Sequence, residues 1–366
     1  MKQEGQLACI DEEGIGKPNV DYPMLRGARI IQHQITEPRR QRPDELEKIH
    51  GCLAGLAVGD AMGRPTELLL HHRKIERKYG RVEGLVGRKA GAVTDDTRLT
   101  LTVADAIIEK GRMITSDELV KFWKDDPEFG CRKFLVSYRR DEGYWIGEHL
   151  AAWGGRLGIP GHLTGYLNFS SLFAGNEAAM MMAPVGILFR GRPESAARAA
   201  LELSRVCIVG QGAEMASSWA AAIAEALSDG GTVESVLEAA TQYASTRIRP
   251  YIEKALEVAA GFTDVYEARH FLYMRCLKAI AIDSRETVPM AFAMFKIASG
   301  DPMTAIRGGA NFGRDSDTIA GMAGLLSGAL TGVSSIDRGI LETVCDVNGL
   351  DIQKYAAQLA DVNQAM

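Results

Sequence analysis

Residues 43–56 read PDELEKIHGCLAGL, and this stretch contains the signals that begin a helix after a proline. Asp44 and Glu47 have capping-box spacing, and an apolar run with helical period follows at once. From there to residue 366 the chain is rich in Ala, Leu, Met and Glu, and glycine-rich links separate the periodic segments. Residues 44–366 are therefore predicted to form one all-α domain.

Several segments show the helical period most clearly, while few segments alternate strictly enough to be strands. Each of the following segments is predicted to form a helix: Leu46–Leu56, Arg98–Glu109, Ser116–Trp123, Ala178–Leu188, Glu194–Val206, Gly212–Leu227, Val233–Tyr243, Thr287–Ala298 and Thr318–Leu330. The three methionines at 180–182 are predicted to belong to the core rather than to a pocket wall.

Residues 1–43 differ from the rest of the chain. They contain four prolines, several glycines and a basic cluster at 39–42, and no helical period survives there. We expect an extended N-terminal arm with a short strand at Ala28–Ile35. The segment Asp21–Arg26 mixes an aromatic, apolar and charged residues, as interaction segments often do. The arm is therefore either a simple tail or a binding segment that could add a strand to a partner's sheet.

Composition excludes several classes of partner. The 366 residues carry a net charge of only −5 with scattered basic residues, which argues against nucleic acid. No apolar run opens the chain, and the stretch Ile319–Val333 is shorter than the roughly 20 residues of a membrane span. We therefore expect a cytoplasmic protein with no membrane contact. Zinc and disulfides are not expected, because the cysteines are far apart: Cys9, Cys52, Cys131, Cys207, Cys276 and Cys345.

Two acidic motifs stand directly before predicted helices. The first is Thr94-Asp95-Asp96-Thr97, and the second is Gly313-Arg314-Asp315-Ser316-Asp317-Thr318. A helix N-terminus favours one acidic acceptor, but capping does not need two carboxylates and a hydroxyl twice in one chain. Such oxygen donors suit Mg²⁺, Mn²⁺ or Ca²⁺, and four carboxylates suggest two divalent ions.

Two further motifs complete a pattern. Gly59-Asp60-Ala61-Met62-Gly63 is followed by Glu67, and Gly175-Asn176-Glu177-Ala178-Ala179-Met180 is followed by Ala183-Pro184-Val185-Gly186. In this order and spacing, the four motifs resemble the ADP-ribosylglycohydrolase family, which includes the dinitrogenase-reductase-activating enzymes. The resemblance covers roughly residues 49–331 and leaves the arm outside it.

The resemblance implies a compact, orthogonally packed multi-helix fold and a hydrolase that cleaves the N- or O-glycosidic bond between ADP-ribose and a side chain, often arginine. It implies two Mg²⁺ or Mn²⁺ ions with the ligands Thr94, Asp95, Asp96, Asp315, Asp317 and Thr318. It places Glu67 where it binds or activates water, or gates the site. We expect substrate contacts from Asp60, Gly63, Asn176, Gly313 and Arg314.

The chemistry agrees with such a layout. Breaking a glycosidic bond builds positive charge on the ribose, which nearby carboxylates stabilise. Metal ions lower the pKa of bound water, and a carboxylate can take the proton of the attacking water. Asp96, Asp60 and Glu67 are all candidates for this base, and Glu67 is our first choice.

The chain departs from the family pattern at a few positions. Arg314 and Ser316 replace a glycine and a threonine, while Glu177 replaces a small residue and Met181 an arginine. Ser316 keeps the hydroxyl, and Arg314 either pairs with a substrate phosphate or lies on the surface. These changes leave the linkage open: ADP-ribosyl-arginine, another ADP-ribosyl linkage, or a small N-riboside.

Two functional hypotheses from different classes remain. The chain is an ADP-ribosyl-protein hydrolase, or it is a binding protein of the immunity type whose arm blocks an ADP-ribosylating toxin. The complete set of acids favours catalysis, and the arm favours an added binding role. A glycine-rich aromatic stretch, Tyr138, Tyr144, Trp145 and Trp153, is either a lid over adenine or ordinary packing. The pair His71-His72 is predicted to lie on a solvated loop or helix face, with diphosphate or target-protein binding as the alternative.

Overall fold

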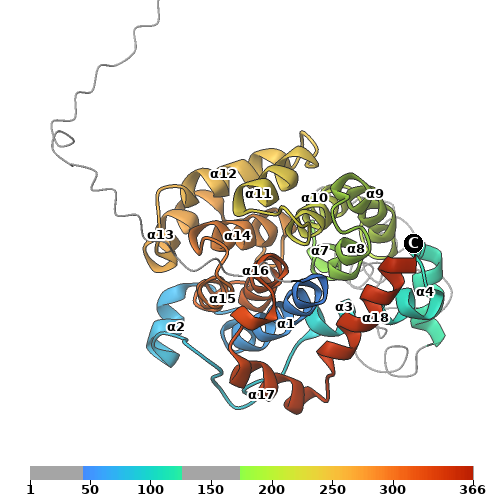
Figure 1. Cartoon of the computed structure of the whole chain (residues 1–366). Helices are drawn as coiled ribbons and strands as arrows, with labels where there is room; N and C mark the ends of the chain where they lie inside the picture. The colour runs from blue at the N-terminus through green and yellow to red at the C-terminus, as the bar shows by residue number, and fades with distance from the viewer. Residues whose placement is uncertain (1–43, 126–173, 366) are drawn as a thin grey trace, which may run out of the picture. The chain divides into compact units, whose positions relative to one another are not determined.

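A computed structural model describes residues 44–125 and 174–365 of the chain. Within these ranges the regular structure is helical, and the β pairing consists of one isolated bridge between Gly175 and Asp283. The all-α prediction is therefore confirmed (Figure 1). The predicted arm and the aromatic stretch at 138–153 lie outside the described residues.

Helices follow one another with short links. The α-helices are α1 (Glu45–Gly63), α2 (His72–Tyr79), α3 (Asp95–Lys110), α4 (Ser116–Asp125), α7 (Glu177–Met180), α8 (Ala183–Leu188), α9 (Pro193–Leu203), α10 (Gln211–Ala226), α11 (Val233–Gln242), α12 (Arg249–Ala259), α13 (Val265–Cys276), α14 (Ser284–Ile297), α15 (Pro302–Ala310), α16 (Ser316–Thr331), α17 (Arg338–Asn348) and α18 (Ile352–Ala365). Short 3₁₀ turns are η1 (Arg64–Thr66), η3 (Ser204–Val206) and η4 (Val333–Ser335).

The helix starts follow local capping chemistry. Asp44 Oδ1 accepts a hydrogen bond from the Glu47 N–H at 2.8 Å, so α1 begins where the sequence predicts. Most predicted helices are present within a few residues. Two predictions differ from the structure: α1 continues past its predicted end at Leu56 to Gly63, and Ala178–Leu188 is predicted as one helix. The structure breaks it into α7 and α8, because Pro184 stands in the first turn of α8 and favours a helix start there.

Helices α1 and α16 pack antiparallel with their backbones in contact at the centre of the described helices (Figure 1). Glycines make this approach feasible. A Cβ added to Gly55 would lie 2.1 Å from the Gly324 carbonyl oxygen, and one added to Gly59 would lie 2.2 Å from that of Ala320. This contact brings the C-terminal end of α1 beside the N-terminal end of α16, where the acidic motif of residues 313–318 lies.

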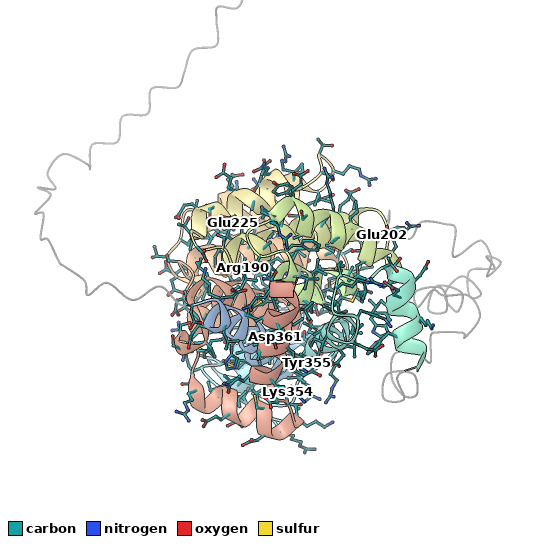
Figure 2. The ribbon with its side chains drawn as sticks, turned by 45° about the vertical axis from the view of Figure 1, so that its right-hand side comes forward. Arg190, Glu202, Glu225, Lys354, Tyr355 and Asp361 are labelled. Atoms are coloured by element: carbon teal, nitrogen blue, oxygen red, sulfur yellow. The ribbon has the colours of Figure 1, made fainter. Side chains whose placement is uncertain are left out.

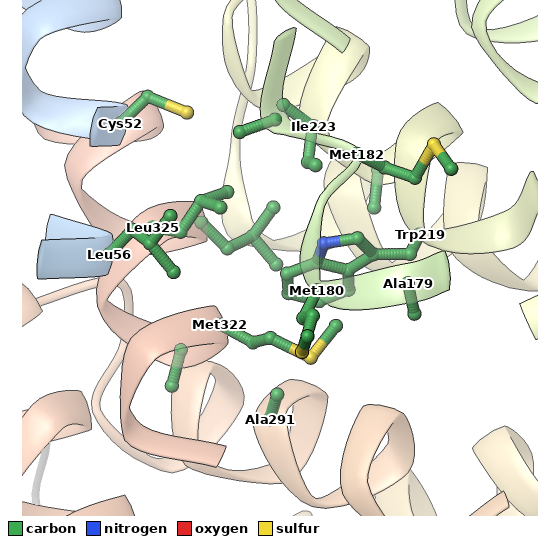
Figure 3. Close-up of a cluster of buried hydrophobic side chains, with 14 of the residues drawn as sticks. Cys52, Leu56, Ala179, Met180, Met182, Trp219, Ile223, Ala291, Met322 and Leu325 are labelled. Carbon is green, nitrogen blue, oxygen red and sulfur yellow. The ribbon is translucent and has the colours of Figure 1, made fainter. Parts of the chain in front are cut away.

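A large apolar core surrounds this helix pair (Figure 3). Trp219 of α10 is fully buried and packs on Phe292 of α14 with ring centroids 5.1 Å apart. Met180 and Met182 are also buried, which confirms that the methionines belong to the core. This packing fixes α7, α10 and α16 around the site described below.

Charged side chains such as Glu202, Lys354 and Asp361 are exposed on the outside of the helices (Figure 2). In residues 44–125 and 174–365, no helix combines the length and the apolar character that a membrane crossing requires. All four cysteines in these ranges are free thiols.

Candidate metal centre

Three carboxylates converge where α16 begins. Carboxylate oxygens of Glu67, Asp315 and Asp317 all lie within 4.8 Å of one another. Asp315 and Asp317 are buried at the start of α16, whereas Glu67 follows the 3₁₀ turn after α1 and is partly exposed. The glycine contact between α1 and α16 therefore joins acids that are far apart in the sequence.

The other acidic motif meets this group through one hydrogen bond. Asp96, in the first turn of α3, accepts at Oδ2 from the Thr318 hydroxyl at 3.2 Å. Thr94 is the N-cap of α3, and its hydroxyl accepts from the Asp96 N–H at 3.3 Å. Asp95 is partly exposed beside them. The structure thus brings together the helix starts whose six residues we expected to be metal ligands.

Asp60, near the end of α1, holds the start of α3 in place through hydrogen bonds. It is fully buried, and its carboxylate accepts from the Thr94 N–H at 3.0 Å and from the Thr97 hydroxyl at 2.6 Å. The Thr97 N–H donates to the same carboxylate at 3.2 Å. Burial raises its pKa to about 6, even though these hydrogen bonds lower it. Asp60 therefore fastens the start of α3 to the end of α1.

Burial and mutual repulsion raise the pKa of several of these acids. The pKa of Asp315 is raised to about 7, first by burial and then by Glu67 and Asp95. The pKa values of Asp96 and Asp317 are also raised, first by burial and then by neighbouring carboxylates. For Glu67 the pKa rises through burial and the nearby Asp95. Carboxylates gathered in this way favour a bound cation or protons.

Two buried oxygens show that this donor set fits a divalent ion. Asp96 Oδ1 and Asp317 Oδ1 are buried and have no hydrogen-bond partner within the described residues. A buried carboxylate oxygen normally has a partner, because losing water without one is costly. Oxygen-only donors from carboxylates and threonines are the ligands that Mg²⁺ and Mn²⁺ prefer.

Asn176 and Glu177 lie next to the carboxylates of the two acidic motifs. The Asn176 side-chain amide donates to Asp315 Oδ2 at 2.5 Å, so it orients that acid. Glu177 is 9% exposed, and its Oε2 has no partner among the described residues. Burial and the nearby Asp95 raise the pKa of Glu177 to about 7. We had not assigned Glu177 to the site; its only signal in the sequence was an acid where a small residue is common.

The other residues predicted to contact the substrate, Gly63, Gly313 and Arg314, make contacts within the protein. Gly63 packs against the backbone of Ser316 and Asp317. Gly313 has a positive φ of 82°, and a Cβ added to it would lie 2.4 Å from the Leu69 carbonyl oxygen. The Arg314 guanidinium, expected to meet a phosphate or to lie on the surface, is buried and pairs with Glu286 at 2.7 Å.

A comparison with known protein families gives one match that covers most of the chain. The sequence model of the family described as ADP-ribosylglycohydrolase matches residues 41–366. The match extends beyond residues 49–331, to which the motif resemblance was confined, because it includes the helices α17 and α18.

Several curated relatives are similar over most of their length. An uncharacterized protein of Escherichia coli, YegU, is 28% identical over 87% of this chain and 98% of its own. The ADP-ribosylarginine hydrolase Tri1 of Pseudomonas putida is 27% identical, covering 86% of this chain and 78% of its own. The ADP-ribosyl-[dinitrogen reductase] glycohydrolase of Rhodospirillum rubrum is 23% identical, covering 82% and 90%.

A solved structure shares the fold. It is described as an ADP-ribosylglycohydrolase-related protein complex and superposes with a TM-score of 0.60, covering 87% of this chain and 98% of its own. Sequence identity is 21%, so this likeness shows the helical fold alone.

Proposed function

Because this chain belongs to the ADP-ribosylglycohydrolase family, we propose that it removes ADP-ribose from modified arginine side chains with Mg²⁺ or Mn²⁺ bound. The arginine linkage is supported by the relative from Pseudomonas putida, which is named for that activity. The observation that carries the metal proposal is the pair of buried carboxylate oxygens without partners, Asp96 Oδ1 and Asp317 Oδ1, in two motifs joined by the Asp96–Thr318 hydrogen bond.

The proposed ligands of two ions come from both helix starts and are Thr94, Asp95, Asp96, Asp315, Asp317 and Thr318. Glu67 lies close enough to Asp315 and Asp317 to join them. When bound, such ions would orient the ribose through its hydroxyls and lower the pKa of a bound water molecule.

Among the three candidate bases, the contacts support Glu67. Both Asp60 and Asp96 are buried and already accept hydrogen bonds from threonines, whereas Glu67 is partly exposed. The raised pKa of Glu67 brings it closer to neutral pH, where a general base is most effective. In this proposal Glu67 takes the proton of the attacking water, and the surrounding carboxylates stabilise the positive charge on the ribose.

A substrate panel tests the proposal. Purified protein with Mg²⁺ is incubated with ADP-ribosyl-arginine protein, ADP-ribosyl-serine peptide and a set of nucleosides, and released ADP-ribose or ribose is measured by chromatography. We expect release of ADP-ribose from the arginine linkage, and loss of release with a chelator. Release from nucleosides alone would identify a small N-riboside as substrate and contradict the proposal.

We further propose an immunity-type role, in which residues 1–43 bind and block an ADP-ribosylating toxin while the metal centre reverses its modification. The support is in the sequence: the arm precedes the matched family region almost entirely and mixes apolar, aromatic and charged residues at 21–26.

A further inference from the structure

Two residues with strained backbones lie side by side next to the metal centre. Leu68 has a φ of 57° and Arg314 a φ of 65°, a region that non-glycine residues rarely adopt. The Leu68 N–H donates to the Arg314 carbonyl at 2.7 Å, and the Arg314 N–H donates to the Leu69 carbonyl at 3.1 Å. The segment after Glu67 is therefore fastened to the residue before Asp315. Strain of this kind persists only where other contacts hold the backbone in place.

A buried ion pair supplies those contacts. Arg314 donates through Nε and Nη2 to the two carboxylate oxygens of Glu286, each at 2.7 Å. It also donates to the Lys278 carbonyl at 2.6 Å, and the Lys278 N–H donates to Glu286 at 2.5 Å. Glu286 is fully buried on α14. A bidentate pair whose hydrogen bonds are met in this way is rigid and directional.

The other side of Glu67 is held independently. The Thr66 hydroxyl donates to the Ala310 carbonyl at 2.6 Å and lies 2.9 Å from the Ser316 hydroxyl. Glu67 thus stands between two anchors: Leu68 and Leu69 pair with Arg314, and Thr66 contacts the end of α15 and the first residue of α16.

From this geometry we propose that Arg314 is a positioning residue, whose ion pair with Glu286 holds the Glu67 carboxylate against Asp315 and Asp317. The inference rests on the proposed hydrolase function, and it gives Arg314 a role different from the phosphate contact predicted from the sequence. Arg314 acts through its backbone hydrogen bonds with Leu68 and Leu69, because its side chain points to Glu286 on α14 rather than to the carboxylates of the metal centre.

A double-mutant cycle tests this role. Arg314→Lys keeps the charge but loses the fork that matches a carboxylate. In the wild-type background we expect kcat on ADP-ribosyl-arginine protein to fall by roughly 10-fold or more, since small displacements of a catalytic group cost that much. KM should change by less than about 2-fold, because the displaced carboxylate acts on the attacking water rather than in binding the substrate. The Mn²⁺ dissociation constant should rise no more than it does in Glu67→Gln, because Arg314 acts on the metal centre through Glu67. Glu286→Gln, which keeps the shape, should act in the same direction.

In a Glu67→Gln background, Arg314→Lys should change single-turnover rates by less than about 2-fold, because the group that it positions is already gone. Arg249→Lys is the matched control: Arg249, the first residue of α12, also donates to carbonyls, of Thr241 at the end of α11 and of Ala244 in the following link, at 3.1 Å each. It should leave kcat unchanged. Equal loss in both backgrounds, or no loss in the wild-type background, would overturn the role of Arg314. Absence of any turnover by the wild-type protein would instead contradict the proposed function, and the inference with it.

Discussion

At the scale of single residues, the site combines features that destabilise the folded protein when no cation is bound. Asp96 and Asp317 each have one buried oxygen without a partner in the described residues, and both pKa values are raised by burial and by neighbouring acids. Such groups cost free energy of folding unless a cation or a proton neutralises them. The site is therefore built for a ligand rather than for stability.

Replacing Glu67 by Gln keeps the shape of the side chain but removes the proposed base. We expect kcat to fall by roughly 10²-fold or more. Glutamine is still able to accept a hydrogen bond, so the fold should be unchanged. Steady-state kinetics and circular dichroism check both statements, and Glu202→Gln on the exposed surface is the control. Full activity in Glu67→Gln would transfer the role of base to another acid.

The raised pKa values predict an unusual pH dependence for protein stripped of metal by a chelator. In the folded chain Asp315 has a pKa of about 7 and Asp60 of about 6, above the roughly 3.9 of an unfolded aspartate. Between these values the unfolded chain binds fewer protons than the folded chain, so the free energy of unfolding falls as pH rises. We expect the melting temperature to drop from pH 5 to pH 8 and Mg²⁺ to restore it most at pH 8.

Asp317→Asn separates this effect from general alkaline instability. It removes one of the mutually repelling acids, so the variant should melt higher than the wild type at pH 8 without metal and gain less from Mg²⁺. Differential scanning calorimetry measures both. A wild-type melting temperature that rises over this pH interval would show that the acids are not destabilising.

Residue types and spacing predicted that the two acidic motifs lie together, but not what every residue near them does. The surplus of carboxylates at 94–97 and 313–318 predicted a common site, and Asp96 does meet Thr318. The partner of Arg314 was not predictable, because Glu286 lies on another helix and nothing in the local sequence points to it. The same holds for Asp60, whose contacts with Thr94 and Thr97 depend on how α1 and α3 pack.

At the scale of helices, the contact between α1 and α16 determines how close Glu67, which follows α1, lies to Asp315 and Asp317 at the start of α16. Gly55→Ala should destabilise the fold strongly, because the added Cβ would lie 2.1 Å from a backbone oxygen that no side-chain rotation can move away. Overpacking of this kind costs about 1–3 kcal/mol or more. A melting-temperature measurement tests it. Gly84→Ala is the control, because nothing lies within 4 Å of its added Cβ, and its stability should be nearly unchanged.

The helices that sequence periodicity predicted are those with a continuous apolar face, such as α10 and α16. Helix α13 was not among the segments that we singled out. Its sequence places Arg269 in the buried face, where it pairs with Glu76 at 2.8 Å, while Met274 is exposed. A charge inside and an apolar side chain outside remove the helical period, so only tertiary contacts identify its orientation.

At the scale of the whole molecule, binding and hydrolysis should be separable. Deleting residues 1–43 removes the proposed toxin-binding arm but leaves the helices and the metal centre intact. We expect the truncated protein to lose affinity for a cognate ADP-ribosyltransferase in calorimetry and to keep its hydrolase activity. Asp317→Ala should do the reverse. Equal affinity of the full-length and truncated proteins for every transferase tried would leave the arm as a tail.

The glycine contact between α1 and α16 also bears on which ion the site accepts. Where the two backbones touch, no side chain lies between them that could change rotamer. The distance between the adjoining ends of these helices is therefore set by backbone atoms. Mg²⁺ binds oxygen at about 2.0–2.1 Å and Ca²⁺ at about 2.3–2.6 Å. Accommodating the larger ion would push Glu67, which follows α1, away from Asp315 and Asp317 at the start of α16. We therefore expect selection by ionic radius: Mn²⁺ should replace Mg²⁺ in turnover assays, whereas full activity with Ca²⁺ would show that the site can expand.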